Sequence, residues 1–345
     1  MLTIQEKRNS RAIAYWLLIC CAVIFGMIVL GGITRLTGSG LSMVDWAPIT
    51  GILPPLNNAD WQEVFLRYQQ FPEYRLINYD MSLNEFKSIF WFEYGHRLLG
   101  RFIGLIFFLP FLFFLFKRKI EKSLIPKLIF MLVLGGLQGL MGWYMVKSGL
   151  VNDPHVSQYR LTAHLGLAVF IYAYMIWVAL GLLYPKLSES SDCSRNPFAR
   201  LSLIVSGIII LTILSGGFVA GTRAGYAFNT FPLMGGQLVP TGLFDLSPIW
   251  RNFFENIVTV QFDHRVLAFL LFLIIPVLWY RVGKIKMHVL VTTGRHLLLA
   301  ALVLQITLGI STLLLIVPVT MAVAHQAGAI MLLTASLFLS HQLHR

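Results

Sequence analysis

The composition of this chain excludes a soluble protein. Of its 345 residues, 57% are hydrophobic and only 12% are charged, whereas about a quarter of the residues of a soluble domain are charged. The net charge of +12 would favour an acidic partner such as a nucleic acid, unless the basic residues serve to orient the chain in a membrane.

Uncharged apolar stretches predict the transmembrane helices. In chain order they are 12–34, 102–116, 128–146, 161–185, 201–222 and 266–280, followed by a longer stretch at 296–344. The last stretch is too long for one helix and is interrupted by Pro318, so it predicts two helices. We therefore expect an all-α polytopic membrane protein with eight transmembrane helices and both termini on one side.

Two of the predicted helices, 102–116 and 266–280, are too short to cross a bilayer. Each has 15 residues, whereas a crossing needs roughly 20. Their first turns must come from the charged residues that precede them. In both cases these residues include a His-Arg pair, at 96–97 and 264–265.

Two long segments lie on the side opposite the termini, at about 34–90 and 223–262. They are rich in Trp, Tyr and Phe, which favour the membrane interface, so either segment could form a lid. Within the first segment, Ser82 and Glu85 make a capping-box pattern. This pattern predicts that a helix begins at Leu83 and continues into the second span.

The excess positive charge falls on one side of the predicted membrane. The termini and the segments 117–127, 185–200 and 281–295 together hold 16 Lys and Arg against 4 Asp and Glu, whereas the opposite side holds 11 of each kind. The positive-inside rule assigns the basic side, with both termini, to the cytoplasm. The basic charge is therefore an orientation signal, and we expect no nucleic-acid partner.

The two halves of the chain resemble each other. Matching segments occur in the same order, at 31–55 and 216–240, 93–99 and 261–267, 137–142 and 304–309, and 162–168 and 323–329. This order predicts two pseudo-symmetric four-helix bundles, at 12–184 and 201–340, joined by a cytoplasmic linker at 185–200. Because each half starts on the same side, the internal repeat is parallel.

Four of the nine histidines, His96, His164, His264 and His325, each lie a few residues into a helix that enters from the external side. A lone histidine there is usually a polar residue satisfied by backbone or water. Four at a similar depth, two in each half, instead indicate a function. Two facing neutral imidazoles are typical axial ligands of haem iron, whereas zinc would need further ligands that the sequence does not supply nearby. The pattern predicts one bis-histidine haem site in each half.

Arginines near these histidines are candidates for pairing with haem propionates. Arg97 and Arg265 directly follow two of the histidines, and Arg35 and Arg223 lie at a similar depth. Arginine suits planar carboxylates because its guanidinium can bind them with two parallel hydrogen bonds. For Arg35 and Arg223, anchoring at the membrane interface is an equally good interpretation.

Glu93 marks a difference between the halves, because Gln261 stands at the matching position. A carboxylate three residues before His96 lies on the same helix face, where it could bind a proton, stabilise positive charge or bind a hydroxyl. Glutamine cannot act as an acid or base, so the difference predicts one haem that reacts and one that relays electrons. Alternatively, Glu93 pairs with Arg97 at i+4 as a helix-end salt bridge.

Together these motifs resemble the haem A synthase family over nearly the whole chain, from about Gly26 onward. The motifs are GGITRLTGSGLSMVDWAPITGILPP, FEYGHRLLGR, LQGLMGWYMV, RLTAHLG, FDHRVLA and AHQAGA. The resemblance implies oxidation of the C8 methyl of haem O to a formyl group, giving haem A for terminal oxidases. It also implies a haem B cofactor on His264 and His325, substrate haem O on His96 and His164, and a catalytic role for Glu93.

The first external loop, in GLSMVDWAP, lacks the cysteine pair of some bacterial members of that family, so the chain resembles the alphaproteobacterial and mitochondrial subtype. Its short, uncleaved N-terminus predicts a bacterial inner membrane protein, with haem sites towards the periplasm. Expected partners are the lipid bilayer, haem O synthase as substrate donor, and a ferredoxin-like protein or a quinol as electron donor. A homo-oligomer is one assembly to test.

The sequence also allows a second class, a di-haem b-type cytochrome that carries electrons between quinol and a partner. The difference between Glu93 and Gln261 favours the enzyme, because a symmetric relay does not need it. An internal repeat also occurs in transporters, but the broken helices expected there are not evident in the sequence.

Overall fold

The protein is a multi-pass, all-helical membrane protein. The structure, a computed structural model, describes residues 4–45, 50–149, 156–185 and 197–345, and no β-strand occurs within these ranges. Eight of its helices are long and apolar enough to cross a membrane, as the sequence predicted. They are α1 (Ile4–Leu36), α4 (Leu83–Phe116), α5 (Ile125–Gly149), α6 (Gln158–Leu183), α7 (Pro197–Thr222), α9 (Ile257–Gly283), α10 (Val289–Leu314) and α11 (Val319–Leu343).

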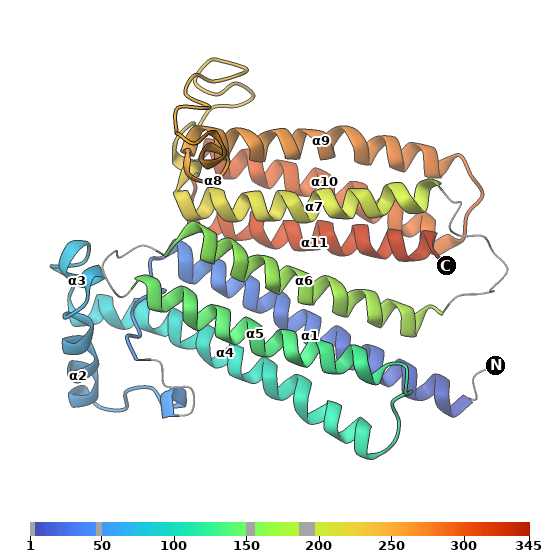
Figure 1. Cartoon of the computed structure of the whole chain (residues 1–345), viewed down its shortest axis with the longest axis horizontal. Helices are drawn as coiled ribbons and strands as arrows, with labels where there is room; N and C mark the ends of the chain where they lie inside the picture. The colour runs from blue at the N-terminus through green and yellow to red at the C-terminus, as the bar shows by residue number, and fades with distance from the viewer. Residues whose placement is uncertain (1–3, 46–49, 150–155, 186–196) are drawn as a thin grey trace.

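The shorter helices lie in the two long loops. The loop between α1 and α4 contains η1 (Thr50–Ile52), α2 (Asn58–Tyr68) and α3 (Pro72–Leu76), and the loop between α7 and α9 contains η3 (Ala224–Tyr226), η4 (Ile249–Arg251) and α8 (Asn252–Glu255). Helices α2, α3 and α8 lie at one end of the molecule, and both termini lie at the other end (Figure 1).

Helix α4 begins where its capping box predicted. The Ser82 side chain accepts a hydrogen bond from the Glu85 N–H, and the Glu85 carboxylate accepts one from the Ser82 N–H at 2.8 Å. Helix α9 begins after Asn256, whose side chain caps the Val258 N–H at 2.9 Å. The predicted start of α4 at Leu83 is therefore confirmed, and in both helices the charged residues before the apolar stretch belong to the helix, as expected.

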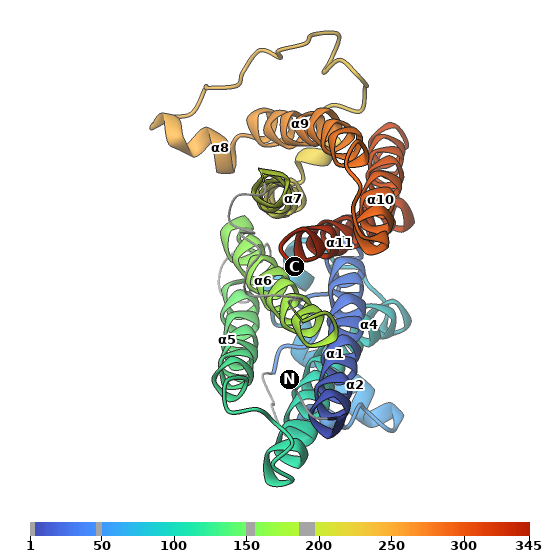
Figure 2. The same ribbon diagram turned by 90° about the vertical axis from the view of Figure 1, so that its right-hand side faces the viewer.

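The eight helices form two groups that lie side by side (Figure 2). One group is α1, α4, α5 and α6, and the other is α7, α9, α10 and α11. Across the boundary, α1 packs against α11, and α6 packs against both α7 and α11. The predicted linker at 185–200 lies mostly outside the described residues, since 186–196 are not described. The division into domains at that segment stays a prediction.

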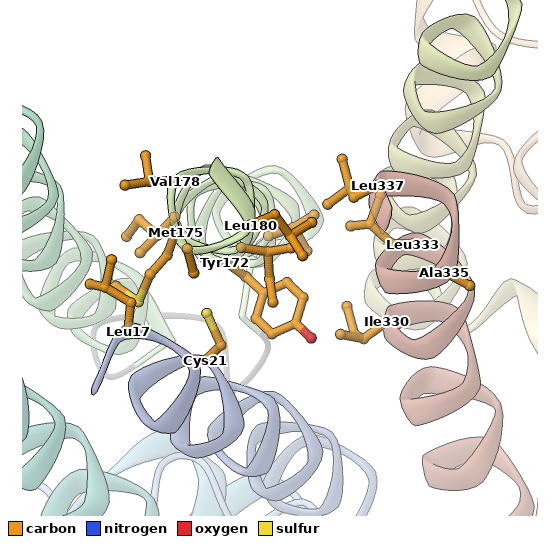
Figure 3. Close-up of a cluster of buried hydrophobic side chains, with 14 of the residues drawn as sticks. Leu17, Cys21, Tyr172, Met175, Val178, Leu180, Ile330, Leu333, Ala335 and Leu337 are labelled. Carbon is orange, nitrogen blue, oxygen red and sulfur yellow. The ribbon is translucent and has the colours of Figure 1, made fainter. Parts of the chain in front are cut away.

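The centre of the molecule is an apolar cluster where α1, α6 and α11 meet. Figure 3 shows Leu17 and Cys21 of α1 beside Tyr172 of α6 and Ile330 of α11, all of them buried. The Tyr172 hydroxyl lies 2.8 Å from the Thr334 hydroxyl, so this large side chain buries its ring and still satisfies its polar end. The two groups of helices therefore share one continuous core.

Two glycines let α7 approach α6 closely across this boundary. A Cβ at Gly217 would lie 3.0 Å from the Thr162 hydroxyl oxygen, and one at Gly221 would lie 2.7 Å from the Gln158 Cα. Glycines four residues apart are a common means of close helix packing in membranes, because they leave room for the backbone of a neighbouring helix.

Replacing Gly221 with leucine should destabilise the protein by about 1–3 kcal/mol, because the new side chain meets backbone that cannot rotate away. Gly207, on the same helix, provides a matched control, since a Cβ there meets nothing within 4 Å in the described parts of the chain. Thermal unfolding of the two purified variants in detergent measures the difference. Equal unfolding temperatures for Gly221→Leu and Gly207→Leu would contradict the close contact.

Candidate functional site

The structure places the four predicted histidines on four different long helices. His96 is on α4, His164 on α6, His264 on α9 and His325 on α11. The His264 and His325 rings face each other across 6.3 Å between centroids, at an interplanar angle of 81°. His96 and His164 lie close enough to interact electrostatically.

The spacing of the His264 and His325 rings fits an iron bound between them. A metal–imidazole bond of about 2.0–2.1 Å, plus about 1.1 Å from the nitrogen to the ring centre, puts the centroids of two opposed ligands about 6.2–6.4 Å apart. The observed separation of 6.3 Å falls in this range. In contrast, no group of three or more His, Cys, Asp and Glu suited to a metal is found within the described ranges.

A glycine from the preceding long helix lies behind each of the four imidazoles. A Cβ on the glycine would lie 3.0 Å from the ring Cε1 for Gly31 and His96, 3.1 Å for Gly142 and His164, 3.3 Å for Gly216 and His264, and 2.8 Å for Gly309 and His325. A Cβ at Gly309 would force the His325 ring to shift, and one at each of the other three glycines would require its ring to give by a few tenths of an ångström. All four rings are therefore supported in the same way, which the sequence interpretation did not foresee.

The ring nitrogens of the four histidines differ in their hydrogen bonding. For three of the four rings, His96, His264 and His325, Nδ1 is buried and makes no hydrogen bond of ordinary geometry among the described residues, although backbone groups of Thr212 and Gln305 interact with the His264 and His325 rings. In His96 and His325, Nδ1 is also nearer to the supporting glycine than Nε2 is. His164 differs, because the Gln138 side-chain amide lies 3.3 Å from both of its ring nitrogens. In His96 and His325, Nε2 is therefore the ring nitrogen that lies farther from the supporting glycine and is available to a metal.

Arg97 and Arg265 bind the loops above the histidine pairs. Arg97 donates hydrogen bonds to two carbonyls of the first loop, among them that of Met43 at 2.6 Å. Arg265 donates to two carbonyls of the second loop, among them that of Phe228 at 2.9 Å. Met43 and Phe228 occupy matching positions in the predicted repeat. That these two arginines bind haem propionates stays a prediction. It is consistent with the Nε of Arg265, which is buried and has no hydrogen-bond partner in the part of the chain described.

Arg35 and Arg223 meet where the two groups of helices join. Arg35, near the end of α1, donates from Nη2 to the Ala220 carbonyl of α7 at 3.3 Å, and it interacts electrostatically with Arg223. The Arg35 Nε is buried without a partner in the described structure. Two neighbouring guanidinium groups repel each other, so an anion placed between them would be stabilised.

Glu93 is held by hydrogen bonds on several sides. Only 2% of the residue is exposed, and its carboxylate accepts from the Ser42 hydroxyl at 2.8 Å, the Met43 N–H at 2.7 Å and the Arg97 guanidinium at 2.6 Å. The salt bridge at i+4, which the sequence left as an alternative, is therefore present. This interaction fixes the carboxylate at the junction of α4 and the first loop.

The second half has a neutral group at the corresponding place. Gln261 is 3% exposed, and its amide donates to the Phe228 carbonyl at 3.1 Å. Its side-chain oxygen is buried and has no partner among the described residues. A glutamine beside Arg265 thus replaces the charged pair of Glu93 and Arg97, and the difference noted in the sequence corresponds to a difference in hydrogen bonding.

A second buried carboxyl, Glu73 of α3, lies in the first loop. It is 7% exposed and accepts a hydrogen bond from the Tyr68 hydroxyl at 3.1 Å, which in turn accepts one from the Asn78 amide at 2.8 Å. The pKa of Glu73 is raised from its usual 4.5 to about 7. Burial is the main cause, the Tyr68 hydrogen bond partly opposes it, and the negative charge of Glu93 adds to the increase. The sequence interpretation missed this residue, because its burial depends on how the loop folds.

The shifted pKa of Glu73 predicts a pH-dependent stability. Because the folded-state pKa is raised to about 7, the folded protein binds more protons than the unfolded chain between about pH 4.5 and 7. The free energy of unfolding should therefore fall as the pH rises through this range, by at most about 3 kcal/mol. Thermal unfolding against pH should show this slope in the parent protein and a smaller one in Glu73→Gln. An unchanged slope in the variant would refute the assignment.

The fold and these residues together define a class of protein, a multi-pass helical membrane protein that buries pairs of histidines between its helices. Residues 14–337 match the cytochrome oxidase assembly protein family (COX15-CtaA), and the chain belongs to this family.

Relatives named haem A synthase match the chain over nearly its whole length. It is 54% identical over 343 residues to the haem A synthase of Nitrosospira multiformis, covering 99% of this chain and 96% of that protein. It is 47% identical over 339 residues to the haem A synthase of Parvibaculum lavamentivorans, covering 98% of this chain and 96% of that protein. It is 43% identical over 351 residues to human haem A synthase COX15, covering 99% of this chain and 85% of that protein. The resemblance drawn from the sequence motifs is thereby confirmed.

Proposed function

We propose that the protein is a haem A synthase, which oxidises the C8 methyl group of haem O to a formyl group. The observation that carries this proposal is the pair of histidine sites in a chain that matches haem A synthases almost end to end. Haem B is assigned to His264 and His325, and substrate haem O to His96 and His164. Imidazoles are common axial ligands of haem iron.

The reaction removes four electrons from the methyl carbon and introduces one oxygen atom. Haem B, when bound, supplies a one-electron carrier. Glu93 is the candidate acceptor for protons released at the reacting carbon, because it lies one turn before His96 on the same helix. Arg97, 2.6 Å from that carboxylate, orients it, and Gln261 leaves the second half without an equivalent base.

A short route joins the two histidine sites through α1 and α11. Gln326 directly follows His325, and its amide donates to the Ile28 carbonyl of α1 at 2.8 Å. The same side chain lies against Gly32, and the neighbouring Gly31 lies against the His96 ring. One hydrogen bond and a few packed residues therefore connect the ligands of the two sites, which supports electron transfer between them.

The arginines at the junction support binding of the propionates. Arg35 and Arg223 lie near each other, and Arg35 and Arg265 each have a buried Nε without a partner in the described chain. A carboxylate is the anion that arginine binds best, through paired hydrogen bonds. Arg35, Arg223 and Arg265 would therefore hold the propionates of a bound haem by charge and hydrogen bonding.

The charge distribution supports placement in a bacterial inner membrane, with the termini in the cytoplasm and the haem sites towards the periplasm. Haem O is an apolar product of another membrane enzyme, haem O synthase, which we propose as the donor. A ferredoxin-like protein or a quinol would exchange electrons with haem B.

Haem analysis tests this function against the di-haem cytochrome. The protein is expressed together with haem O synthase in a host that makes no haem A, and the purified protein and the membranes are extracted for chromatography. We expect one haem B per chain, with haem O and newly formed haem A in addition. Two haem B per chain and no haem A would instead identify a b-type cytochrome.

A further inference from the structure

An apolar hollow opens between α5 and α6 beside the proposed substrate site. Its volume is about 380 Å³, and it is lined by Leu137, Leu140, Met141, Trp143, Tyr144 and Leu167. Met141 precedes Gly142, which supports the His164 ring, and Leu167 lies one turn after His164 on α6. The hollow therefore adjoins one of the two predicted ligands of haem O.

At the matching place of the second half, side chains of the described residues occupy the space next to Gly328. The counterpart of Leu167 is Gly328, which is buried. A Cβ at Gly328 would meet the side-chain oxygen of Gln305 and would lie 3.3 Å from Leu308 Cδ1. Side chains of α10 therefore fill the space between α10 and α11 at this position. In the first half, Leu167 of α6 lines the hollow together with side chains of α5.

Helix α5 also lacks side chains that α10 possesses. Glycines stand at 135, 136 and 139, and the matching residues of α10 are Leu302, Val303 and Ile306. Leu302 is 3% exposed and Ile306 packs against the core. In contrast, a Cβ on any of the three glycines would meet nothing within 4 Å among the described residues. The first half is therefore more open along the same face of its third long helix.

We propose that the hollow between α5 and α6 binds the isoprenoid tail of haem O, and that close packing of α10 on α11 keeps this tail out of the second site. The inference rests on the proposed function, in which His96 and His164 hold haem O. Haem O differs from haem B by its hydroxyethylfarnesyl chain, which is apolar and too large for a space already filled by side chains. The hollow thus distinguishes the substrate from the cofactor, although both present the same iron to a pair of histidines.

Size and lining agree with this ligand. A volume of about 380 Å³ lies within the range of about 300–1,000 Å³ that is typical of small-molecule pockets. The lining side chains are leucine, methionine and aromatic residues, as expected for a site that recognises a hydrocarbon by burial. Leu137, Leu140 and Tyr144 are about half exposed, so the tail could enter sideways from the bilayer.

The test fills the hollow with a larger side chain. Leu137→Trp places an indole in it, and Leu304→Trp is the matched control, since Leu304 occupies the equivalent position of α10 and is similarly exposed, 43% against 47%. The full-length proteins are prepared in lipid nanodiscs, and binding of haem O and of haem B is titrated by absorbance. The spectrum of the resident haem reports whether each variant is folded.

We expect Leu137→Trp to weaken haem O binding at least tenfold. Binding of haem B at the first site and the content of resident haem should stay unchanged in this variant. Leu304→Trp should change the binding of neither haem O nor haem B. Equal loss of haem O and haem B binding, or no loss of either, would overturn the inference. The proposed function would survive this result if the parent still forms haem A. A parent protein that takes up no haem O would overturn the proposed function, and with it this inference.

Discussion

Replacing His264 with alanine should abolish the haem spectrum of the purified protein, whereas replacing His96 should leave it nearly intact. The His264 and His325 rings are spaced for one iron, 6.3 Å apart, and each is supported by a glycine. Removing either ring leaves the iron with one protein ligand, in a site whose buried surroundings offer no substitute among the described residues. We expect at least a tenfold fall in haem content for His264→Ala and His325→Ala.

Haem per chain, measured by extraction and by the reduced spectrum, checks this prediction. His96→Ala and His164→Ala are the matched variants in the other half, and they should retain the resident haem B while losing haem O. Loss of resident haem from His96→Ala with retention in His264→Ala would exchange the roles of the two halves. Equal loss from all four variants would mean that the two sites do not bind haem independently.

The sequence predicted the long helices well, because their signal is local. A run of uncharged residues is sufficient to place a helix in a bilayer, and the capping box at Ser82 and Glu85 locates the beginning of α4. Pro318 likewise separates α10 from α11, since α11 begins at Val319. The histidines could be found because four rare residues recur at one depth.

Other features could not be predicted, because they depend on contacts between distant residues. The contact between Arg97 and the Met43 carbonyl joins residues that are 54 positions apart, and nothing in the local pattern indicates it. The same holds for the burial of Glu73. The four glycines behind the histidines do leave a signal, since all lie in matched segments of the repeat, but only the structure shows that they touch the rings. The hollow beside α5 depends on how α5 and α6 pack, which no local pattern in the sequence indicates.

The salt bridge of Glu93 with Arg97 does not exclude a functional role for Glu93. The salt bridge with Arg97 is present, yet a salt bridge alone does not explain why the second half does without it. Gln261 and Arg265 occupy the same positions there and hold the loop through the Phe228 carbonyl. The charge on Glu93 is therefore not needed to hold the loop on the helix. If the first half requires this charge, the reason is a role in the reaction.

Glu93→Gln should accordingly fold and bind haem while losing haem A formation by about 10²–10⁴-fold, the usual contribution of a positioned acid or base. The variant gives the first half the glutamine–arginine pair that the second half already contains. Some loss of stability is expected, because the 9% exposed side chain of Arg97 keeps a buried charge without its partner. Haem content, unfolding temperature and the ratio of haem A to haem O in extracts are measured together.

Two further variants separate a chemical role for Glu93 from a structural one. Glu255→Gln removes the charge from another pair at i+4, with Arg251, and should leave haem A formation unchanged. Gln261→Glu introduces a carboxylate in the second half and should not restore activity to Glu93→Gln, because it lies beside the relaying haem. Normal haem A formation by Glu93→Gln would remove Glu93 from the chemistry and leave it as the residue that holds the first loop on α4. Full haem O binding without haem A would show instead that substrate reaches its site and stops where a proton acceptor is missing.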